Sequence, residues 1–288
     1  MQRCNLCGDT AWKIREEHGP TQVVQCGCGL VFVTPIPSRA VIEATYRDPY
    51  YDAWHAQESA RRRMWERRAA LVDKVAGRVG RLLDVGCGDA TFLRTVRTRG
   101  WIVAGTELSR EAVARAKDVE LRQGEVWEAG FPDESFDVVT SWHVIEHASD
   151  PMRVAREMLR LLKPGGWLIL ATPNVNDYIF RFGYIAGRLR WPRLYEEDER
   201  ELHLFHFSEA TLARLLSEAG FRDFRNEFDA GAATVFSKRV VNQVAHAWYR
   251  LTGLNWGIGL QVIARKPMAD PSDQEDTHVS EKRAAHQK

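Results

Sequence analysis

The sequence predicts an α/β fold in which helices cover a largely parallel sheet, preceded by a small cysteine-bearing module. After Gly80, short apolar segments alternate with helical segments, which is typical of parallel sheets covered on both faces. Before that point, four of the chain's five cysteines lie within the first 28 residues. The fifth, Cys87, lies in a glycine turn.

The boundaries of the expected elements follow from apolar runs, caps and glycine or proline stops. The N-terminal part is expected to contain strands at 22–25 and 30–33, joined to Cys7 by a polar turn, and helices at 40–46 and 55–76. The strands expected after it are 81–85, 102–107, 119–122, 136–141, 167–171, 221–228 and 259–265. The helices expected among them are 90–99, 110–117, 151–162, 208–219 and 237–251.

These elements divide the chain into parts. We expect a cysteine knuckle at 1–37, a helical N-terminal extension at 38–80, an α/β domain at 81–267 and a polar, disordered tail at 268–288. Within the domain, we expect a lid at about 174–207 and a helical insertion at about 237–253.

The composition excludes several classes of protein. A formal net charge of +1 over 288 residues lacks the basic excess of a dedicated nucleic-acid binder. No apolar run approaches the roughly 18 residues that a membrane-spanning helix needs. The N-terminus has no apolar core of a secretory signal, so a cytoplasmic protein is expected.

The N-terminal cysteines are spaced like metal ligands. Cys4-x-x-Cys7 and Cys26-x-Cys28 are separated by 18 residues, which fits a small zinc-ribbon-like module with four thiolates. The second pair is one residue closer than the usual C-x-x-C, so its geometry is expected to depart from the standard form. Because four protein ligands leave zinc no open position, the expected role is stability or acceptor docking.

A strand that runs into the turn Gly86-Cys87-Gly88 and then a helix is typical of a cofactor-binding loop. A dinucleotide site needs G-x-G-x-x-G, and Thr91 stands at the third glycine position. Glu107 ends the next strand and has no basic neighbour to receive a 2′-phosphate. A carboxylate there can accept hydrogen bonds from both ribose hydroxyls of an adenosyl group.

Five motifs carry a resemblance to a known family. In chain order, they are 82–90, Gly105-Thr106-Glu107-Leu108-Ser109, Phe136-Asp137-Val138-Val139, 142–147 and Leu162-Lys163-Pro164-Gly165-Gly166. Together they resemble class I methyltransferases that use S-adenosylmethionine, above all the group containing ubiquinone-pathway and sugar methyltransferases. The resemblance implies a Rossmann-like, seven-stranded sheet whose last strand, 259–265, runs antiparallel between its neighbours. Ala90 departs from the third glycine of many members.

The resemblance also assigns cofactor-binding residues. They are Asp84, Gly86, Gly88, Glu107, Leu108, Glu125, Val126 and Trp142. Glu107 is expected to hold the ribose and Val126 to contact the adenine. Trp142 is expected either to lie beside the sulfonium or to be a core aromatic residue.

Three histidines are candidates for catalysis: His143 and His147 after the fourth strand, and His203 before helix 208–219. A hydroxyl acceptor must lose its proton during methyl transfer, and a histidine suits this task. His203 matches a catalytic histidine of the sugar methyltransferases and is the first candidate for the base. The alternative roles are loop fixation for His147 and packing of the lid for His203.

The acceptor is expected to be a small molecule or a glycan precursor, for example a sugar, methylated on oxygen, nitrogen or carbon. The aromatic and basic segment 177–195 is interpreted as a pocket for a phosphate-bearing or glycan acceptor, as a surface resting on anionic lipid, or as an ordinary covering helix. Two other functions stay open: an RNA base methyltransferase using arginines between Arg61 and Arg68, and an inactive cofactor-binding partner subunit. Against the first, the Asn-Pro-Pro-aromatic motif is absent.

Overall fold

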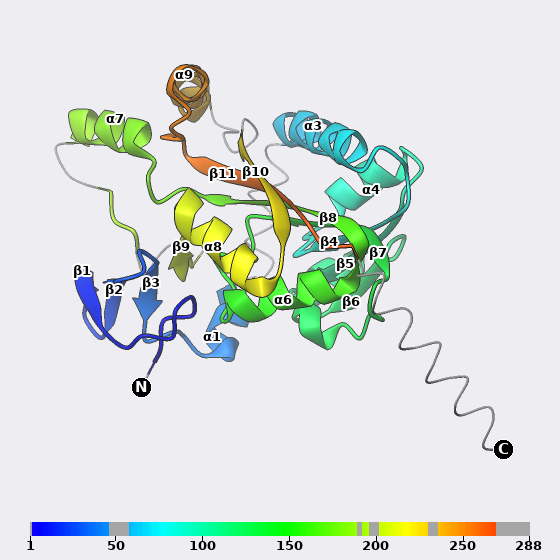
Figure 1. Cartoon of the computed structure of the whole chain (residues 1–288), viewed down its shortest axis with the longest axis horizontal. Helices are drawn as coiled ribbons and strands as arrows, with labels where there is room; N and C mark the ends of the chain where they lie inside the picture. Colours follow the sequence, from blue (N-terminus) through cyan, green and yellow to red (C-terminus); the bar gives the residue numbers. More distant parts are fainter. Residues whose placement is uncertain (1, 46–57, 189–191, 196–201, 230–235, 269–288) are drawn as a thin grey trace.

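The computed structural model describes residues 2–45, 58–188, 192–195, 202–229 and 236–268 (Figure 1). The strands are β1 (Trp12–His18), β2 (Thr21–Cys26), β3 (Val31–Thr34), β4 (Arg81–Val85), β5 (Ile102–Glu107), β6 (Glu120–Gln123), β7 (Phe136–Trp142), β8 (Leu162–Pro173), β9 (Phe205–His206), β10 (Arg222–Phe228) and β11 (Gly259–Arg265). Within this described part, they form a seven-stranded sheet in the order β10-β11-β8-β7-β4-β5-β6 and a four-stranded sheet in the order β1-β2-β3-β9.

The seven-stranded sheet has the topology that the family resemblance implies. Strand β4 is parallel to both β5 and β7, and β7 is parallel to β8. Strand β11 is antiparallel to both of its neighbours, β8 and β10. The carboxyl ends of β4, β5, β7 and β10 therefore lie along the same edge of the sheet, where ligands of open α/β sheets bind.

The helices are α1 (Arg39–Thr45), α3 (Glu58–Ala76), α4 (Thr91–Arg97), α5 (Arg110–Arg115), α6 (Pro151–Leu161), α7 (Tyr178–Arg188), α8 (Glu209–Ala219) and α9 (Phe236–Thr252), with a 3₁₀ turn at Val126–Glu128. Helices α3 and α4 cover one face of the large sheet, and α6 and α8 cover the other (Figure 1). Local sequence sets their ends. The Ser208 hydroxyl caps α8, and Gly220, in the left-handed conformation, ends it.

Two local predictions were wrong. Residues 12–18, expected to form a polar turn, form β1, an edge strand paired with β2 and largely exposed. The apolar alternation that marks a half-buried strand is therefore weak there. Lys163-Pro164-Gly165-Gly166 ends α6 as expected, but the strand begins at Leu162 and runs through this segment. The expected ends of two helices, at 46 and 55–57, and the tail from 269 lie outside the described residues.

The N-terminal module packs directly on the α/β domain. Strand β3 pairs with β9, with Val31 opposite His206 and Phe32 opposite Phe205. The Phe32 and Phe205 rings are stacked, with centroids 6.2 Å apart. The Asn5 amide donates to Asp150 Oδ1 at 2.8 Å, at the start of α6. The module therefore fixes the segment that precedes α8.

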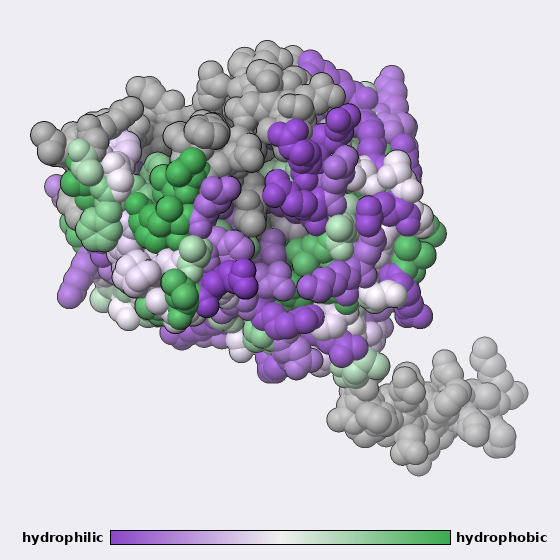
Figure 2. All heavy atoms as spheres, turned by 90° about the horizontal axis from the view of Figure 1, so that it is seen from above, coloured by the Kyte–Doolittle hydropathy of each residue, from purple (hydrophilic) through white to green (hydrophobic). Residues whose placement is uncertain are grey.

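One face of the molecule carries exposed apolar side chains. Figure 2 shows them gathered on the side of α7 and α9, whereas hydrophilic side chains dominate the side of α3. The exposed fractions are 63% for Phe182, 46% for Val240 and 57% for Val244. Among the described residues, no helix has the length and apolar character needed to cross a membrane.

Candidate active site

The loop after β4 is shaped by glycines. Gly86 has φ +70°, and a Cβ built there would lie 2.4 Å from Val144 Cγ2. The Gly86 and Cys87 amides both donate to the Thr106 carbonyl, at 2.9 and 3.0 Å. This loop therefore lies against the end of β5, and the position of Gly86 has neither the space nor the backbone conformation for a side chain.

A pocket opens at the carboxyl ends of β4, β5 and β7. Its lining residues are Val85, Gly86, Gly88, Thr106, Glu107, Leu108, Gly124, Glu125, Val126, Trp142, His143, Val144, His147, Ala148 and Val154. Every predicted cofactor-binding residue except Asp84 is among them. Side chains from distant parts of the sequence thus meet at the predicted place.

Glu107 is fixed at the end of β5. Its carboxylate accepts hydrogen bonds from the amides of Gly88 and Ser109, both at 2.8 Å. The side chain is buried, with 6% exposure, yet it lines the pocket. Hydrogen bonds from two backbone amides orient the carboxylate and favour its charged form.

Asp84 lies behind the pocket wall. It is 2% exposed, and Thr140 Oγ1 donates to its Oδ1 at 2.6 Å. Burial raises the pKa of Asp84 to about 8, against the opposing effects of Thr140 and Arg68. Its side chain packs behind the pocket and does not line it, whereas the sequence predicted that Asp84 binds the cofactor directly.

Trp142 forms part of the pocket wall, and the side chain of Arg68 packs against its ring. It is 6% exposed, and the Arg68 guanidinium carbon lies 4.3 Å from the centroid of its ring. Arg68 pairs with Asp229 at 3.3 Å, and both side chains are buried. The interpretation of this arginine as a contact to RNA is wrong, because its side chain is buried. Its helical spacing from buried Trp65 and Val72 is a signal that it faces inward.

His143 lies between two carboxylates. Its Nδ1 is 3.5 Å from Glu146 Oε1 and its Nε2 is 3.4 Å from Asp229 Oδ2. Burial alone lowers the pKa of His143, but its pairing with Asp229 and Glu146 outweighs this effect and raises the pKa to about 9. Sequence analysis did not identify Asp229 or Glu146. The position of Asp229, just after a strand that ends at the ligand-binding edge, is the signal that was available.

His147 and His203 lie together, with ring centroids 4.9 Å apart. His147 Nδ1 is 2.8 Å from the Leu202 carbonyl and therefore carries the proton that it donates. His206 lies next to His203, and burial lowers its pKa to about 3, so it is neutral. The structure thus brings all three candidate catalytic histidines to one region.

A second cavity, of about 340 Å³, adjoins the histidines. Its lining residues are His143, Pro173, Asn174, Val175, Asp177, Phe180, Arg181, Pro192, Arg193, Leu194, His203, His206 and Ile258. Most of them come from the predicted lid segment. Of the residues described, His143 alone lines both this cavity and the pocket at the strand ends.

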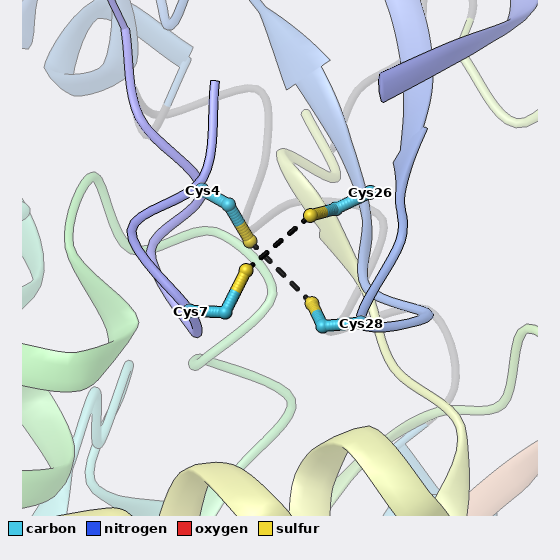
Figure 3. Close-up of side chains that lie close together, drawn as sticks. All are labelled: Cys4, Cys7, Cys26 and Cys28. Carbon is cyan, nitrogen blue, oxygen red and sulfur yellow. Dashed lines mark hydrogen bonds between the residues drawn. The ribbon is translucent and has the colours of Figure 1, made fainter. Parts of the chain in front are cut away.

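The four N-terminal cysteines converge (Figure 3). Their sulfur atoms all lie within 4.8 Å of one another, with Cys4 3.6 Å from Cys28 and Cys7 3.4 Å from Cys26. Gly29 follows the second pair with φ +93°, and its amide donates to the Cys26 carbonyl at 2.9 Å. This tight turn allows Cys26 and Cys28 to face the same point despite their short spacing.

Comparison with known proteins agrees with this geometry. A family described as a methyltransferase domain matches residues 56–225, more than half of the 288-residue chain. The ubiquinone biosynthesis O-methyltransferase of Thiobacillus denitrificans is 32% identical over 176 residues, covering 58% of this chain and 72% of that protein. The enzyme of the same name from Paraburkholderia phymatum is 36% identical over 131 residues, covering 42% and 56%. The chain thus spans about half the length of several of these relatives.

Solved structures share the fold. An S-adenosylmethionine-dependent methyltransferase from Archaeoglobus fulgidus superposes with a TM-score of 0.53 at 20% identity, covering 74% of this chain and 99% of that one. A possible histamine N-methyltransferase from Thermotoga maritima gives 0.52 at 20% identity, covering 75% and 94%. With the match over residues 56–225 and the topology of the sheet, the chain belongs to the class I S-adenosylmethionine-dependent methyltransferase family.

Proposed function

We propose that the protein transfers a methyl group from S-adenosylmethionine to a small-molecule or glycan-precursor acceptor. The observation that carries this proposal is the position of His143, which lines both the pocket at the strand ends and the 340 Å³ cavity. A cofactor in the first and an acceptor in the second would meet at this side chain. The name of the Thiobacillus and Paraburkholderia relatives, ubiquinone biosynthesis O-methyltransferase, supports a small acceptor that is methylated on oxygen.

On this proposal, the residues of the first pocket bind the cofactor. Glu107 accepts hydrogen bonds from the ribose hydroxyls with its remaining lone pairs, while the Gly88 and Ser109 amides hold the carboxylate in place. Gly86 and Gly88 let the backbone approach the methionine part. Glu125, whose pKa burial raises to about 7, and Val126 lie beside the adenine. Asp84 acts indirectly, by supporting the loop from behind.

Methyl transfer is an in-line displacement, in which the methyl carbon bonds to the acceptor as its bond to sulfur breaks. The sulfur leaves as neutral S-adenosylhomocysteine, and a hydroxyl acceptor loses its proton. Alignment alone supplies about 7–11 kcal/mol of such a barrier. In this proposal, Trp142 positions the cofactor, and His203, which lines the acceptor cavity, is the candidate base. His143 and His147 hold the loop between the two sites.

The acceptor cavity favours a polar molecule with an acidic group, such as a phosphorylated sugar. Arg181 and Arg193 line it together with three histidines, and Asp177, the acidic residue among its lining residues, is paired with Arg181. The two rival functions have less support. Arg68, within the run proposed to contact RNA phosphates, is buried, and an inactive partner subunit does not need an acceptor cavity beside the cofactor pocket.

We also propose that the cysteine cluster binds a structural zinc ion. Four thiolates at about 2.3 Å from a tetrahedral ion lie about 3.8 Å apart. The Cys4–Cys28 and Cys7–Cys26 separations, 3.6 and 3.4 Å, are close to this value. Since all four positions would be filled by protein, the ion would stabilise the module and, through the pairing of β3 with β9, the acceptor side of the site.

The apolar face of α7 and α9 supports peripheral contact with a membrane through segment 177–195. Phe182 is exposed on α7, within this segment, and Val240 and Val244 are exposed on α9, which packs against α7. The protein should co-sediment with vesicles of anionic lipid. The double variant Phe182→Glu with Val244→Glu should no longer co-sediment, and its melting temperature should stay unchanged. Equal sedimentation of the double variant would contradict this contact.

The central experiment is calorimetric titration with S-adenosylmethionine and S-adenosylhomocysteine. The unmodified protein should bind both, and Glu107→Ala should weaken binding by at least about tenfold, the effect of losing roughly 1.4 kcal/mol. Glu218→Ala, on the exposed surface of α8, is the matched control. Absence of binding to the folded protein would overturn the proposal, whereas binding without turnover over a broad acceptor panel would favour the partner-subunit function.

A further inference from the structure

The four-stranded sheet of the N-terminal module holds part of the predicted lid segment beside the acceptor cavity. Tyr195 is 8% exposed and is buried on one face of this sheet, together with three valines of β2 and β3, Val23, Val31 and Val33. Val175 and Leu194, which line the acceptor cavity, pack against the same cluster. The sheet therefore supports the wall of the cavity from outside.

A bulge in β1, the outer edge strand of this sheet (Figure 1), turns Glu16 towards the same face. Ile14 is paired with Val24. The next pair joins Glu16 to Val23, which leaves Arg15 as an extra residue on β1. Because side chains alternate between the two faces of a sheet, one extra residue moves all later side chains to the other face. An unbroken strand would place Glu16 on the face of Val24, away from the lid segment.

Glu16 holds the backbone of the lid segment. The Leu194 amide donates to both oxygens of the Glu16 carboxylate, at 3.0 Å each. His18 Nε2 lies 3.1 Å from Glu16 Oε2 and donates to it, because a carboxylate oxygen only accepts. The His18 ring meets the ring of Tyr195 edge to face, with centroids 5.5 Å apart. The side chains of Glu16 and His18 are 22% and 11% exposed, so these contacts are partly shielded from water.

Arg193 is the residue that this arrangement presents to the cavity. It lines the cavity and directly precedes Leu194, whose amide is bonded to Glu16. The other arginine of the lining, Arg181, is paired with Asp177. In the part of the chain that the structure describes, Arg193 forms no ion pair. Its charge is therefore available to an anion bound in the cavity.

We propose that Arg193 binds the acidic group of the acceptor and that Glu16 is the positioning residue that holds Arg193 at the cavity. This inference rests on the proposed methyl transfer and on an acceptor that carries a phosphate group. A guanidinium group binds phosphate through two parallel hydrogen bonds. Fixing the backbone at Leu194 reduces the conformational entropy that Arg193 loses when it binds, so the acceptor is held more tightly and in one orientation.

Calorimetric titration with phosphates tests this site on the full-length protein saturated with S-adenosylhomocysteine. Inorganic phosphate and glucose 6-phosphate should bind, whereas glucose, the neutral probe, should not. Arg193→Ala should weaken the binding of both phosphates by about tenfold or more. Glu16→Ala should weaken it by about fivefold, because the arginine must then be ordered on binding. This variant also removes a negative charge, and charge alone predicts tighter binding of an anion, so the direction of the change identifies positioning.

Two further variants on β1 complete the test. Glu16→Gln keeps an oxygen that accepts from the Leu194 amide and should bind phosphate like the unmodified protein. Glu17→Ala, at the adjacent exposed position, is the matched control. Hydrogen exchange of the Leu194 amide reports the contact directly. It should accelerate by at least about tenfold in Glu16→Ala, through loss of a hydrogen bond to a charged group, and stay unchanged in Glu17→Ala.

The contrary outcomes separate the parts of the proposal. Absence of phosphate binding to the unmodified protein, or equal binding by Arg193→Ala, would overturn recognition by Arg193. Equal or tighter phosphate binding by Glu16→Ala would overturn the positioning role. S-adenosylhomocysteine should bind all variants equally, because neither residue lines the cofactor pocket. Its failure to bind the unmodified protein would contradict the proposed function, whereas intact cofactor binding without phosphate binding would contradict only this acceptor site.

Discussion

The guanidinium carbon of Arg68 lies over the Trp142 ring in the active-site wall, 4.3 Å from the centroid of the ring. Helix α3, from the N-terminal extension, thereby reaches a tryptophan at the end of β7. The charge of Arg68 is balanced by Asp229, which also contacts His143. This arrangement joins the extension, the cofactor pocket and the histidine cluster through buried charges.

Removal of Arg68 should strongly destabilise the protein. Arg68→Ala leaves Asp229 as a buried charge without its cationic partner on α3, and breaking a buried pair costs about 3–5 kcal/mol. Urea denaturation measures the free energy of unfolding. Arg67→Ala, on the exposed side of the same helix, should change it by less than about 0.5 kcal/mol. The double variant Arg68→Met with Asp229→Asn should recover much of the loss, and equal stabilities of Arg68→Ala and the unmodified protein would contradict the pair's role.

Gly86→Ala should damage both folding and cofactor binding. A Cβ would enter the space of Val144 and force a side chain into φ +70°, a backbone strain of about 1–3 kcal/mol. Thermal melting and calorimetry with S-adenosylmethionine measure the two effects. Gly183→Ala is the control, because no atom lies within 4 Å of its Cβ position and alanine favours the helix by about 0.5–1 kcal/mol. An unchanged melting temperature of Gly86→Ala would contradict this prediction, because it would show that the loop can accommodate a Cβ at this position.

Asp84 should make stability depend on pH. Because its pKa in the folded protein is raised to about 8, the folded state holds a proton that the unfolded chain releases near pH 4. Its contribution is fully present at acid pH and is lost as the pH rises towards and through 8. Urea denaturation at pH 5 and pH 9 should therefore show a smaller decline for Asp84→Asn than for the unmodified protein. Asp223→Asn, at an exposed position of β10, should retain the full decline.

Loss of zinc from the cysteine cluster should loosen the acceptor side of the site. Strand β3 is paired with β9, and the Val33 amide donates to the Leu204 carbonyl at 2.9 Å. Hydrogen exchange at Val33, whose amide is bonded to Leu204, should therefore accelerate in Cys28→Ser, while exchange in β4 and β5 stays slow. Cys87→Ala, outside the cluster, controls for loss of a thiol. Equal protection of the Val33 amide in all three proteins would contradict a role of the zinc cluster in holding β3 against β9.

Sequence analysis recovered the parts of the fold that are specified locally. Apolar runs marked 81–85, 102–107 and 259–265 as strands, and all three have those bounds. Ser208 and Gly220 marked the ends of α8 by their capping chemistry. That seven of the eight predicted cofactor-binding residues would line one pocket was also predictable, because they follow strand ends in a regular order. Strand β1 was not predicted, because an exposed edge strand shows little alternation of apolar and polar residues.

The acceptor side could not be predicted to the same depth. Arg68 and Asp229 are charged residues in segments without a catalytic motif, and only tertiary packing buries them. Nothing in the sequence near Asp229 indicates that it meets both an arginine of α3 and a histidine after β7. Local pattern specifies helices and strands, whereas the balance of buried charges depends on contacts between distant segments.

The pairing of β3 with β9 has a consequence for how the protein assembles. Phe32 and Phe205 meet across most of the length of the chain, whereas the residues that line the pocket at the strand ends all lie between 85 and 154. Closing a long loop costs more entropy and slows the contact that closes it. The acceptor half of the site should therefore mature after the cofactor half. During synthesis, the N-terminal strands must wait, with an uncovered edge at β3, until residue 206 has left the ribosome.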